Sequence, residues 1–156
     1  MDKFNSVKEF WFRYLKSINE DINSTSLKYT SWYFGNEKIA NELADLVLLG
    51  VKKATTSLYY FYEIENEELP KSGDLSVITD FSGNAKCIIK TNSIKIIPFN
   101  KVSEHFAFKE GEGDKSLEYW RNAHIKFFNE ELSELGMKFS EEMLVVCEEF
   151  ELVYRE

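Results

Sequence analysis

Cysteine and long apolar runs are scarce in this chain of 156 residues, and each scarcity excludes a class of protein. The two cysteines, Cys87 and Cys147, lie in strand-like apolar runs at no metal-binding spacing, so we expect reduced, buried thiols and no zinc site. No apolar run reaches the ~18 residues that a membrane-spanning helix needs. The first residues lack the apolar core of a signal peptide, so we expect a cytoplasmic protein with no membrane partner.

Basic charge is also in short supply. The formal net charge is -8, and residues 129–156 hold nine acidic side chains against Lys138 and Arg155. Binding of long nucleic acids depends largely on cationic contacts to phosphate, so this balance disfavours such a partner. One local patch remains available to a nucleic acid, made of Lys52, Lys53, Lys86, Lys90, Lys101 and Arg121. A small, roughly neutral ligand suits the charge better.

Amphipathic periodicity predicts three long helices. Ser6 and Ser116 are suitable N-caps for the first and the third. Gly50 and Gly136 follow the second and the third, where glycine ends a helix without steric cost. The helices are expected over residues 6–18, 37–49 and 116–135.

The remaining apolar runs predict strands joined by short turns. We expect strands over residues 75–79, 86–97 with a bend near 92–93, and 143–154, with a hairpin loop at 81–84. Residues 55–62 are consistent with a strand or a helical turn, residues 102–108 with a short helix, and residues 21–30 with a loop.

Helices placed between hairpin-linked strands, without βαβ alternation, predict an α+β fold with a mostly antiparallel, curled sheet. No repeat or linker divides the chain. We therefore expect one domain over residues 1–156, with a helical extension at 1–30 and the core at 31–156.

The most informative stretch follows the second expected helix. Directly after its stop at Gly50 come Lys52, Lys53, Thr55, Thr56 and Ser57. An ammonium group and several hydroxyl groups within a few residues offer a candidate base and a candidate nucleophile. A solvated connector between two elements is the alternative that this stretch alone leaves open.

Three blocks of the chain resemble the ASCH domain, a relative of the PUA-type RNA-binding barrels. Gly50-x-Lys52-x-x-Thr55 resembles the G-x-K-x-x-T motif of that family, and residues 99–114 resemble its second block. Residues 116–128 resemble a longer bacterial branch, and the similarity runs from about Trp32 to Tyr154. The resemblance implies a small, curled, PUA-like β-barrel with about three packed helices.

The same resemblance implies an activity, because short bacterial members of the family are amidohydrolases that remove the acyl group from N4-acetylcytidine. By residue matching, Thr55 would attack the amide carbonyl and Lys52 would take its proton. Glu110, three positions after Ala107, would orient the pair or protonate the leaving cytidine amine. A lysine acts as a base only when burial or a neighbouring cation lowers its pKa to ~7–8.

Strand geometry tests this assignment. In a regular strand, Lys52 and Thr56 share a face, whereas Lys52 and Thr55 do not. Lys52 and Thr55 converge only where the chain turns or bulges, which Gly50 makes easy. A regular strand here therefore favours Thr56 over Thr55.

The glycine-rich loop after residue 108 carries Glu110, Glu112 and Asp114 at alternate positions, and spacing alone does not select one. A solvated acidic loop and a weak divalent-metal site are alternatives, because hard cations prefer oxygen ligands. No histidine or cysteine joins these residues, which disfavours a transition metal. We expect neither a metal nor another cofactor.

Further candidate substrate-binding residues are Thr56, Lys53, Trp120, Arg121 and His124. Trp120 and His124 are four positions apart and share a helix face, where core packing is the alternative to capping a pocket. Arg121 would then reach a phosphate or a carbonyl. The aromatic run at 32–34 is expected to pack in the core, with stacking on a base as the alternative.

Three functions remain open at this point. The first is hydrolysis of the N4-acyl amide of acetylcytidine or a related small modified nucleoside. The second is a non-catalytic RNA-binding module, and the third is a ribonuclease that recruits Lys52, Lys53 and His124. The expected partner is accordingly a small modified nucleoside or a short RNA.

Overall fold

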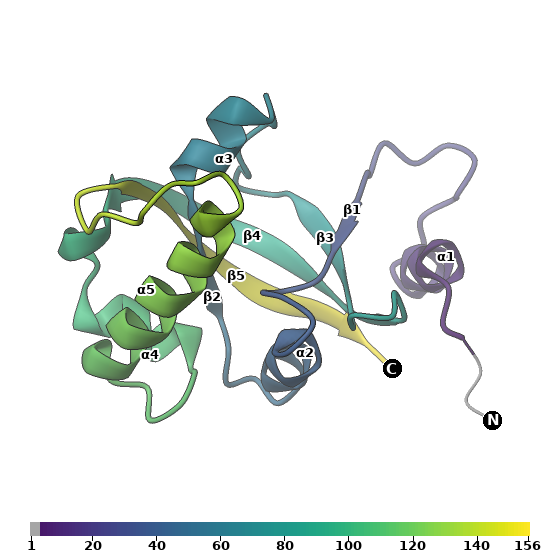
Figure 1. Cartoon of the computed structure of the whole chain (residues 1–156). Coiled ribbons are helices and arrows are strands. Elements are labelled where there is room, and N and C mark those ends of the chain that lie inside the picture. Colours follow the sequence, from purple (N-terminus) through teal and green to yellow (C-terminus); the bar gives the residue numbers. More distant parts are fainter. Residues whose placement is uncertain (1–3) are drawn as a thin grey trace.

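The computed structural model describes residues 4–156, which build five strands and five α-helices around one sheet (Figure 1). The strands are β1 Thr30–Trp32, β2 Ala54–Leu58, β3 Leu75–Thr79, β4 Ala85–Pro98 and β5 Leu144–Arg155. They pair in the order β1-β3-β4-β5-β2, and each neighbouring pair is antiparallel except β1 with β3. The expected α+β class with a mostly antiparallel sheet is confirmed.

Two long strands curl the sheet into a half-barrel. β4 has 14 residues and pairs with β5 along most of its length. The register between them shifts at Ile88/Ile89 and again at Thr91/Ser93, and such bulges bend and twist a strand. The bend expected near residues 92–93 is therefore confirmed. The curl leaves β1 and β2 as the two edge strands.

The helices are α1 Val7–Ser17, α2 Ala40–Leu48, α3 Tyr59–Ile64, α4 Glu104–Glu110 and α5 Leu117–Ser133, with a 3₁₀ turn, η1, at Phe99–Lys101. The three long helices expected from periodicity are α1, α2 and α5. Ser6 and Ser116 cap α1 and α5, because each hydroxyl accepts a hydrogen bond from a backbone N–H in the first turn. No helix among the described residues is both long and apolar enough to cross a membrane.

Three segments differ from the sequence prediction in detail. α2 begins at Ala40, later than residue 37, because Asn36 holds the N–H groups of residues 38–40 in a turn. Residues 55–62 divide, with β2 ending at Leu58 and α3 beginning at Tyr59. The expected loop at 21–30 runs into β1, which pairs in parallel with β3, with Thr30 opposite Ser76.

Three apolar clusters attach the helices to the sheet. The α1 cluster joins Phe10, Trp11, Tyr14 and Leu15 to Leu75, Val77 and Ile88. The α2 cluster joins Leu43, Ala44 and Val47 to Ile78, Cys87, Ile89 and Phe150. Since neighbouring strand residues point to opposite faces, α1 and α2 cover opposite faces of β3 and β4. The third cluster packs α4 and α5 against β2 and β5. Figure 1 accordingly shows α1 and α5 at opposite ends of the molecule.

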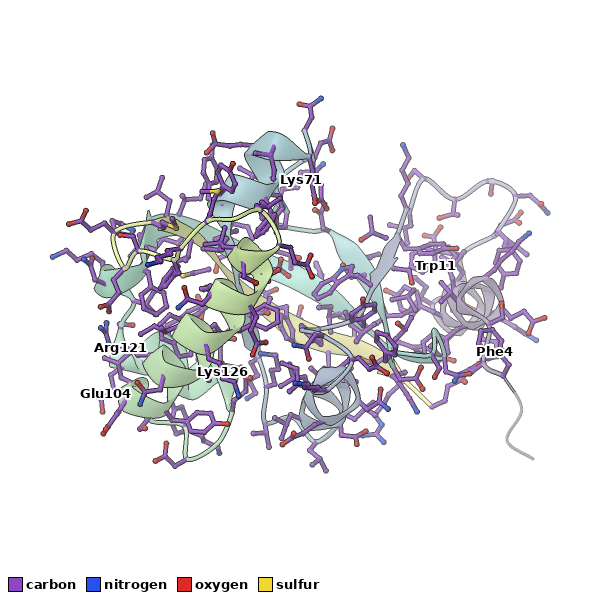
Figure 2. The ribbon with its side chains drawn as sticks, in the orientation of Figure 1. Phe4, Trp11, Lys71, Glu104, Arg121 and Lys126 are labelled. Carbon is purple, nitrogen blue, oxygen red and sulfur yellow. The ribbon has the colours of Figure 1, made fainter. Side chains whose placement is uncertain are left out.

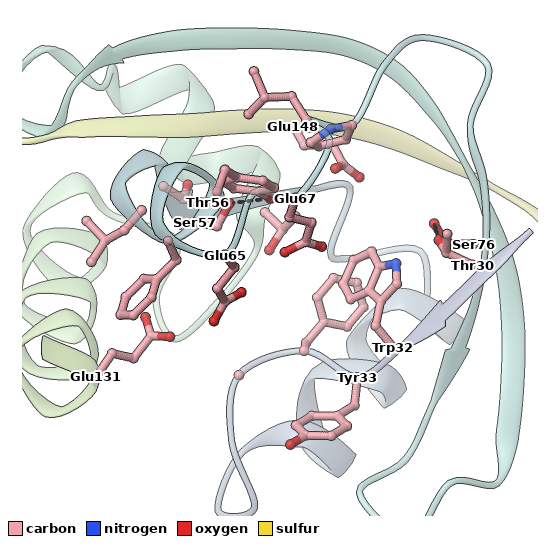
Figure 3. Close-up of a pocket in the computed structure, with 18 of the residues that line it drawn as sticks. Thr30, Trp32, Tyr33, Thr56, Ser57, Glu65, Glu67, Ser76, Glu131 and Glu148 are labelled. Carbon is pink, nitrogen blue, oxygen red and sulfur yellow. Dashed lines mark hydrogen bonds between the residues drawn. The ribbon is translucent and has the colours of Figure 1, made fainter. Parts of the chain in front are cut away.

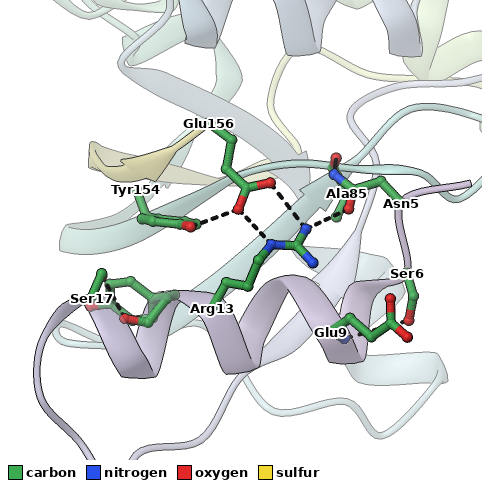
Figure 4. Close-up of polar contacts among 9 residues, drawn as sticks. Asn5, Ser6, Glu9, Arg13, Ser17, Ala85, Tyr154 and Glu156 are labelled. Carbon is green, nitrogen blue, oxygen red and sulfur yellow. Dashed lines mark hydrogen bonds and ion pairs between the residues drawn. The ribbon is translucent and has the colours of Figure 1, made fainter. Parts of the chain in front are cut away.

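Polar contacts tie α1 to the C-terminal end of β5 (Figure 4). Arg13 donates from Nε to the Glu156 carboxylate at 2.6 Å, and the Tyr154 hydroxyl donates to the same carboxylate at 2.7 Å. The two side chains of the ion pair are 42% and 38% exposed, so the pair contributes less than about 1 kcal/mol. The apolar cluster is therefore the main attachment of α1.

Candidate functional site

Lys52 is a buried lysine at the entry to β2. The chain reaches it through Gly50, which has a φ of 75°, and the N–H groups of Val51 and Lys52 bond back to the Leu46 carbonyl. The Lys52 side chain is 1% exposed, and its Nζ donates to Glu110 Oε1 at 3.1 Å and to Glu112 Oε2 at 3.2 Å. Two carboxylates therefore enclose the ammonium group and stabilise its charge.

Glu110 is the centre of this arrangement, which we call the Lys52 network (Lys52, Thr56, Glu110, Glu112, Trp120 and His124). Its Oε2 accepts a hydrogen bond from the Thr56 hydroxyl at 2.7 Å and another from Trp120 Nε1. His124 Nε2 lies 3.3 Å from the same oxygen. These partners come from β2 and α5, so the last residue of α4 joins both elements through one buried carboxylate.

The contacts of His124 favour its positively charged form. Its Nδ1 lies 2.8 Å from the carbonyl oxygen of Trp120, and its Nε2 faces Glu110. Because both partners are hydrogen-bond acceptors, both ring nitrogens must be protonated. Burial alone lowers the pKa of His124, but the attraction of Glu110 outweighs it and leaves the pKa raised. Burial raises the pKa of Glu112, against the attraction of Lys52, so Glu112 is the carboxyl group of the network whose charge is less favoured.

Mutual compensation fixes the charges of Lys52 and Glu110. Burial opposes the charge of Lys52, but Glu110 and Glu112 outweigh it and raise the lysine's pKa. Burial likewise opposes the charge of Glu110, but Lys52 and then His124 outweigh it and lower its pKa. These contacts therefore hold Lys52 as a cation and Glu110 as an anion. A lysine that acts as a general base needs a lowered pKa instead.

The network also places a histidine beside the acidic loop. Glu110, Glu112 and His124 offer ligand atoms that lie within 4.8 Å of one another. The sequence interpretation that no histidine joins these carboxylates is wrong, because α5 brings His124 to them from outside the loop. The Lys52 ammonium lies within hydrogen-bond distance of both carboxylates and serves as the cation between them.

A cavity of about 870 Å³ lies between the two edge strands (Figure 3). Trp32, Tyr33 and Phe34 form one wall, and α3, residues 55–58 and the end of α5 form the other. The strands between them contribute polar groups to the lining, from Thr30, Ser76, Thr91 and Glu148. The cavity adjoins the Lys52 network, because Phe34 lines the cavity and its ring centroid lies 5.3 Å from Lys52 Nζ.

β2 is a regular strand and directs its two threonines to opposite faces. Burial alternates along it, with Thr56 buried and Thr55 partly exposed. Both threonines contribute to the cavity lining, but the Thr56 hydroxyl bonds to Glu110, on the face that a regular strand shares with Lys52. Thr55 lies directly opposite Glu148 of β5 in the antiparallel ladder. Such residues share a face, with Cβ atoms about 4.5–5.5 Å apart.

Glu148 is a buried carboxyl group in the cavity lining. Its residue is 6% exposed, and Thr91 donates to its Oε2 at 3.3 Å. No cationic side chain in residues 4–156 lies within ion-pair distance of it. Burial raises the pKa of Glu148 to about 7, against a smaller opposing effect of the Thr91 hydrogen bond. This group changes its charge near neutral pH.

The other sequence candidates lie elsewhere. Trp120 and His124 are in the Lys52 network, stacked at 4.3 Å between ring centroids, and do not line the cavity. Lys53 is exposed. Arg121, on α5, pairs with Glu141 and lies at the end of the molecule away from Trp11 (Figure 2). Neither Lys53 nor Arg121 lines the cavity.

Sequence reasoning missed Glu148, and it named Glu112 only as an alternative to Glu110, not as a second partner of Lys52. A signal for Glu148 was present, because alternation places it on the same face as Val146 and Phe150, which are buried. A carboxylate inside that apolar pattern indicates a functional position. For Glu112 no such signal exists, since the glycines on both sides leave the loop conformation undetermined by sequence.

The comparisons with known proteins agree with one another. The family model of the ASCH domain matches residues 30–154, whereas no curated protein matches the chain. The structure is similar to that of an ASCH domain from Lactobacillus crispatus JV V101, with a TM-score of 0.86 and 42% identity over 95% of this chain and 94% of that one.

Two further structures are similar. Protein EF3133 from Enterococcus faecalis V583 has a TM-score of 0.83 and 39% identity, over 94% of this chain and 87% of that one. Hypothetical protein PH0355 shares the fold alone, with a TM-score of 0.52 and 20% identity, over 80% of this chain and 97% of that one. The expected curled, PUA-like sheet with packed helices is thus confirmed. Because the family match spans most of the chain and two solved structures share its fold and much of its sequence, the chain belongs to the ASCH domain family.

Proposed function

We propose that this protein hydrolyses the N4-acyl amide of acetylcytidine or of a related small modified nucleoside, in the cavity between β1 and β2. The observation that carries the proposal is the position of Thr55, the threonine of the family motif. It lies in the lining of a cavity of about 870 Å³, opposite a buried carboxyl group. Ligand cavities in proteins have volumes of about 300–1,000 Å³, which admits a nucleoside.

Thr55 is the nucleophile in this proposal, because it is the accessible one of the two motif-region threonines. Thr56 is 8% exposed and its hydroxyl already donates to Glu110. A hydroxyl group attacks a carbonyl carbon only after a base takes its proton. Glu148 is the group opposite Thr55 whose pKa, about 7, suits that exchange.

Glu148 can then carry the proton through both steps of the reaction. Ionised Glu148 takes the Thr55 proton as Oγ1 bonds to the acyl carbon. The bond between the acyl carbon and the nitrogen breaks, and Glu148 returns the proton to the leaving cytidine amine. Glu148 then takes a proton from a water molecule as the water oxygen bonds to the acyl carbon; the bond between that carbon and Thr55 Oγ1 breaks, and Glu148 returns the proton to Oγ1, which releases the carboxylic acid.

Lys52 and Glu110 are positioning residues in this scheme. Their charges are fixed by mutual contact, so neither exchanges a proton in the reaction. Lys52 is two positions before β2, and Glu110 bonds to Thr56 within it. The network thereby fixes the strand that presents Thr55 to the cavity. The general base expected at Lys52 is thus reassigned to Glu148.

The test is incubation of the purified protein with N4-acetylcytidine and chromatography for cytidine. We expect release of cytidine, with kcat/KM rising as the pH increases through about 7, because the ionised form of Glu148 is the base. Glu148→Gln is expected to lower kcat by roughly 10²–10⁴-fold. Glu149→Gln is the matched control, because Glu149 pairs with Lys109 outside this cavity. Absence of cytidine release by the unaltered protein would reject the proposal.

A further inference from the structure

The cavity lining has an extreme charge composition. Eight carboxylate side chains line it, and none of the lining residues is a lysine, an arginine or a histidine. They come from separate parts of the chain, including Glu67 after α3, Glu131 on α5 and Glu148 on β5, whereas Trp32 and Tyr33 lie on the opposite side of the space (Figure 3). A concave site lined by one sign of charge attracts ligands of the opposite sign and repels those of its own.

Aromatic side chains supply the second feature of the lining. Trp32 and Phe34 pack edge to face, with ring centroids 4.8 Å apart, on one side of the cavity. Phe61, Tyr62 and Phe127 stand on the side formed by α3 and α5. Aromatic faces attract cations as well as stacking on flat rings. Together with the carboxylates, they favour a flat ligand that carries positive charge.

Glu148 is the carboxyl group of this lining whose negative charge is least compensated by neighbouring groups. It is more than nine-tenths buried, and no described residue donates a hydrogen bond to its Oε1. The groups acting on it are Thr91 of β4, which donates to it, Asp74 before β3, which repels its charge, and Lys52, which attracts it from within the Lys52 network. Tyr62 of α3 is an uncharged neighbour. A buried carboxylate without its own cation is costly unless something else pairs with it.

We propose that this cavity selects its nucleoside by charge: a positively charged base is preferred over a neutral one, a phosphate-bearing form is excluded, and Glu148 is the counter-charge of the base. This inference rests on the proposed function, since it concerns the same cavity, and it implies that N4-acetylcytidine, whose ring is neutral, binds less tightly than a cationic analogue. On this proposal the protein acts on free nucleosides, because a 5′-phosphate would have to enter a cavity that eight carboxylate side chains line.

The test is calorimetric titration with three ligands that share the cytosine ring and ribose. 3-Methylcytidine carries a positive charge on its ring at neutral pH, cytidine is neutral, and cytidine 5′-monophosphate is anionic. We expect 3-methylcytidine to bind about tenfold more tightly than cytidine, and the monophosphate about tenfold more weakly. Equal or tighter binding of the monophosphate would overturn the proposal. Undetectable binding of 3-methylcytidine at millimolar concentration would do the same.

Glu148→Gln isolates the contribution of the counter-charge. The amide keeps the shape and an oxygen for Thr91, so we expect the preference for 3-methylcytidine over cytidine to fall by about fivefold or more. Glu149→Gln removes the adjacent carboxylate, which lies outside the cavity, and is expected to keep the full preference. A full preference in Glu148→Gln would reject Glu148 as the counter-charge. The three-ligand series on the unaltered protein decides the charge selection without any variant.

The outcomes for binding and for turnover are separate. The charge preference without any release of cytidine from N4-acetylcytidine would support this inference and reject the proposed hydrolysis. Release of cytidine without the charge preference would reject this inference and leave the hydrolysis in place.

Discussion

At the scale of single residues, Lys52 shows that a family motif does not determine the protonation state of its lysine. Burial was expected to lower its pKa, and burial does oppose its charge. Two carboxylates reverse the outcome, and one of them, Glu112, comes from a loop whose conformation no periodicity predicts. The sequence singles out Lys52, but its protonation state depends on a contact between residues 60 positions apart.

Removal of the Lys52 charge tests this network directly. Lys52→Met leaves Glu110 and Glu112 buried with less compensation, so we expect a loss of about 3–5 kcal/mol in the free energy of unfolding. Urea denaturation measures it. Lys53→Met is the matched control, because Lys53 is exposed, and should change stability by less than about 0.5 kcal/mol. Equal stability of both variants would show that the buried ion pair is absent in solution.

The pKa of Glu148 makes a prediction about stability. Folding raises this pKa from 4.5 to about 7, so the folded protein holds the proton to higher pH than the unfolded chain. The contribution of Glu148 to stability is then fully present below about pH 4 and is lost as the pH rises through about 7. Glutamine mimics the protonated form. We expect Glu148→Gln to be more stable than the unaltered protein, by roughly 2–3 kcal/mol, at about pH 8.

Thermal melting across the pH range checks this expectation. The stability difference should shrink toward zero near pH 4, where both states of the unaltered protein are protonated at this position. A Glu148→Gln variant that is less stable than the unaltered protein at alkaline pH would mean that Glu148 has a cationic partner in solution.

At the scale of elements, the turn after α4 holds the site together. Gly111 has a φ of 70°, and an added Cβ would lie 2.3 Å from the carbonyl oxygen of Val51. Gly136 has a similar φ of 68° but open space around the added atom. Both Gly→Ala changes therefore cost left-handed strain, about 1–2 kcal/mol, and the Gly111 change adds a clash with the segment that carries Lys52. We expect Gly111→Ala to be the more destabilising by at least about 1 kcal/mol in urea denaturation. Equal losses would contradict the close packing of the two segments.

The elements that the sequence predicted well are those with long periodic patterns. α1, α2 and α5 and the two long strands follow from apolar spacing and from serine or glycine at their ends. β1 was missed, because a strand of three residues has no period and its parallel partner lies far along the chain. The sequence could not show which threonine shares a face with Lys52, because that depends on whether β2 is regular. The ladder with β5 shows that β2 is regular, so Thr56 shares that face.

At the scale of the molecule, the N-terminal helix and the cavity belong to separate faces. α1 packs Trp11 into its own apolar cluster, away from the cavity lining. We expect Trp11→Ala to lower the free energy of unfolding by about 3–5 kcal/mol because it leaves a large void. The kcat and KM of the folded fraction should stay within about twofold, since distant sites act independently. Melting and steady-state kinetics on one preparation check both, and a large change in KM would show that α1 contributes to the site.

The acidic excess of the molecule is unevenly distributed in the fold. The acidic excess near the C-terminus was interpreted as disfavouring nucleic acid. In the structure, part of this C-terminal acidic excess lines one cavity, together with acidic residues from the segment after α3. Net charge alone does not show this, because the grouping arises from how α3, α5 and β5 are brought together by the curl of the sheet.

The most direct measurement is a comparison of kcat/KM for N4-acetylcytidine between Thr55→Ala and Thr56→Ala. Both threonines line the cavity, but Thr55 lies opposite Glu148, whereas the Thr56 hydroxyl donates to Glu110, which keeps its contacts to Lys52, Trp120 and His124 in the second variant. We expect Thr55→Ala to lose roughly 10³-fold or more and Thr56→Ala to lose less than about tenfold. Turnover by Thr55→Ala at the rate of the unaltered protein, or a larger loss in Thr56→Ala, would contradict the assignment of the chemistry to Thr55.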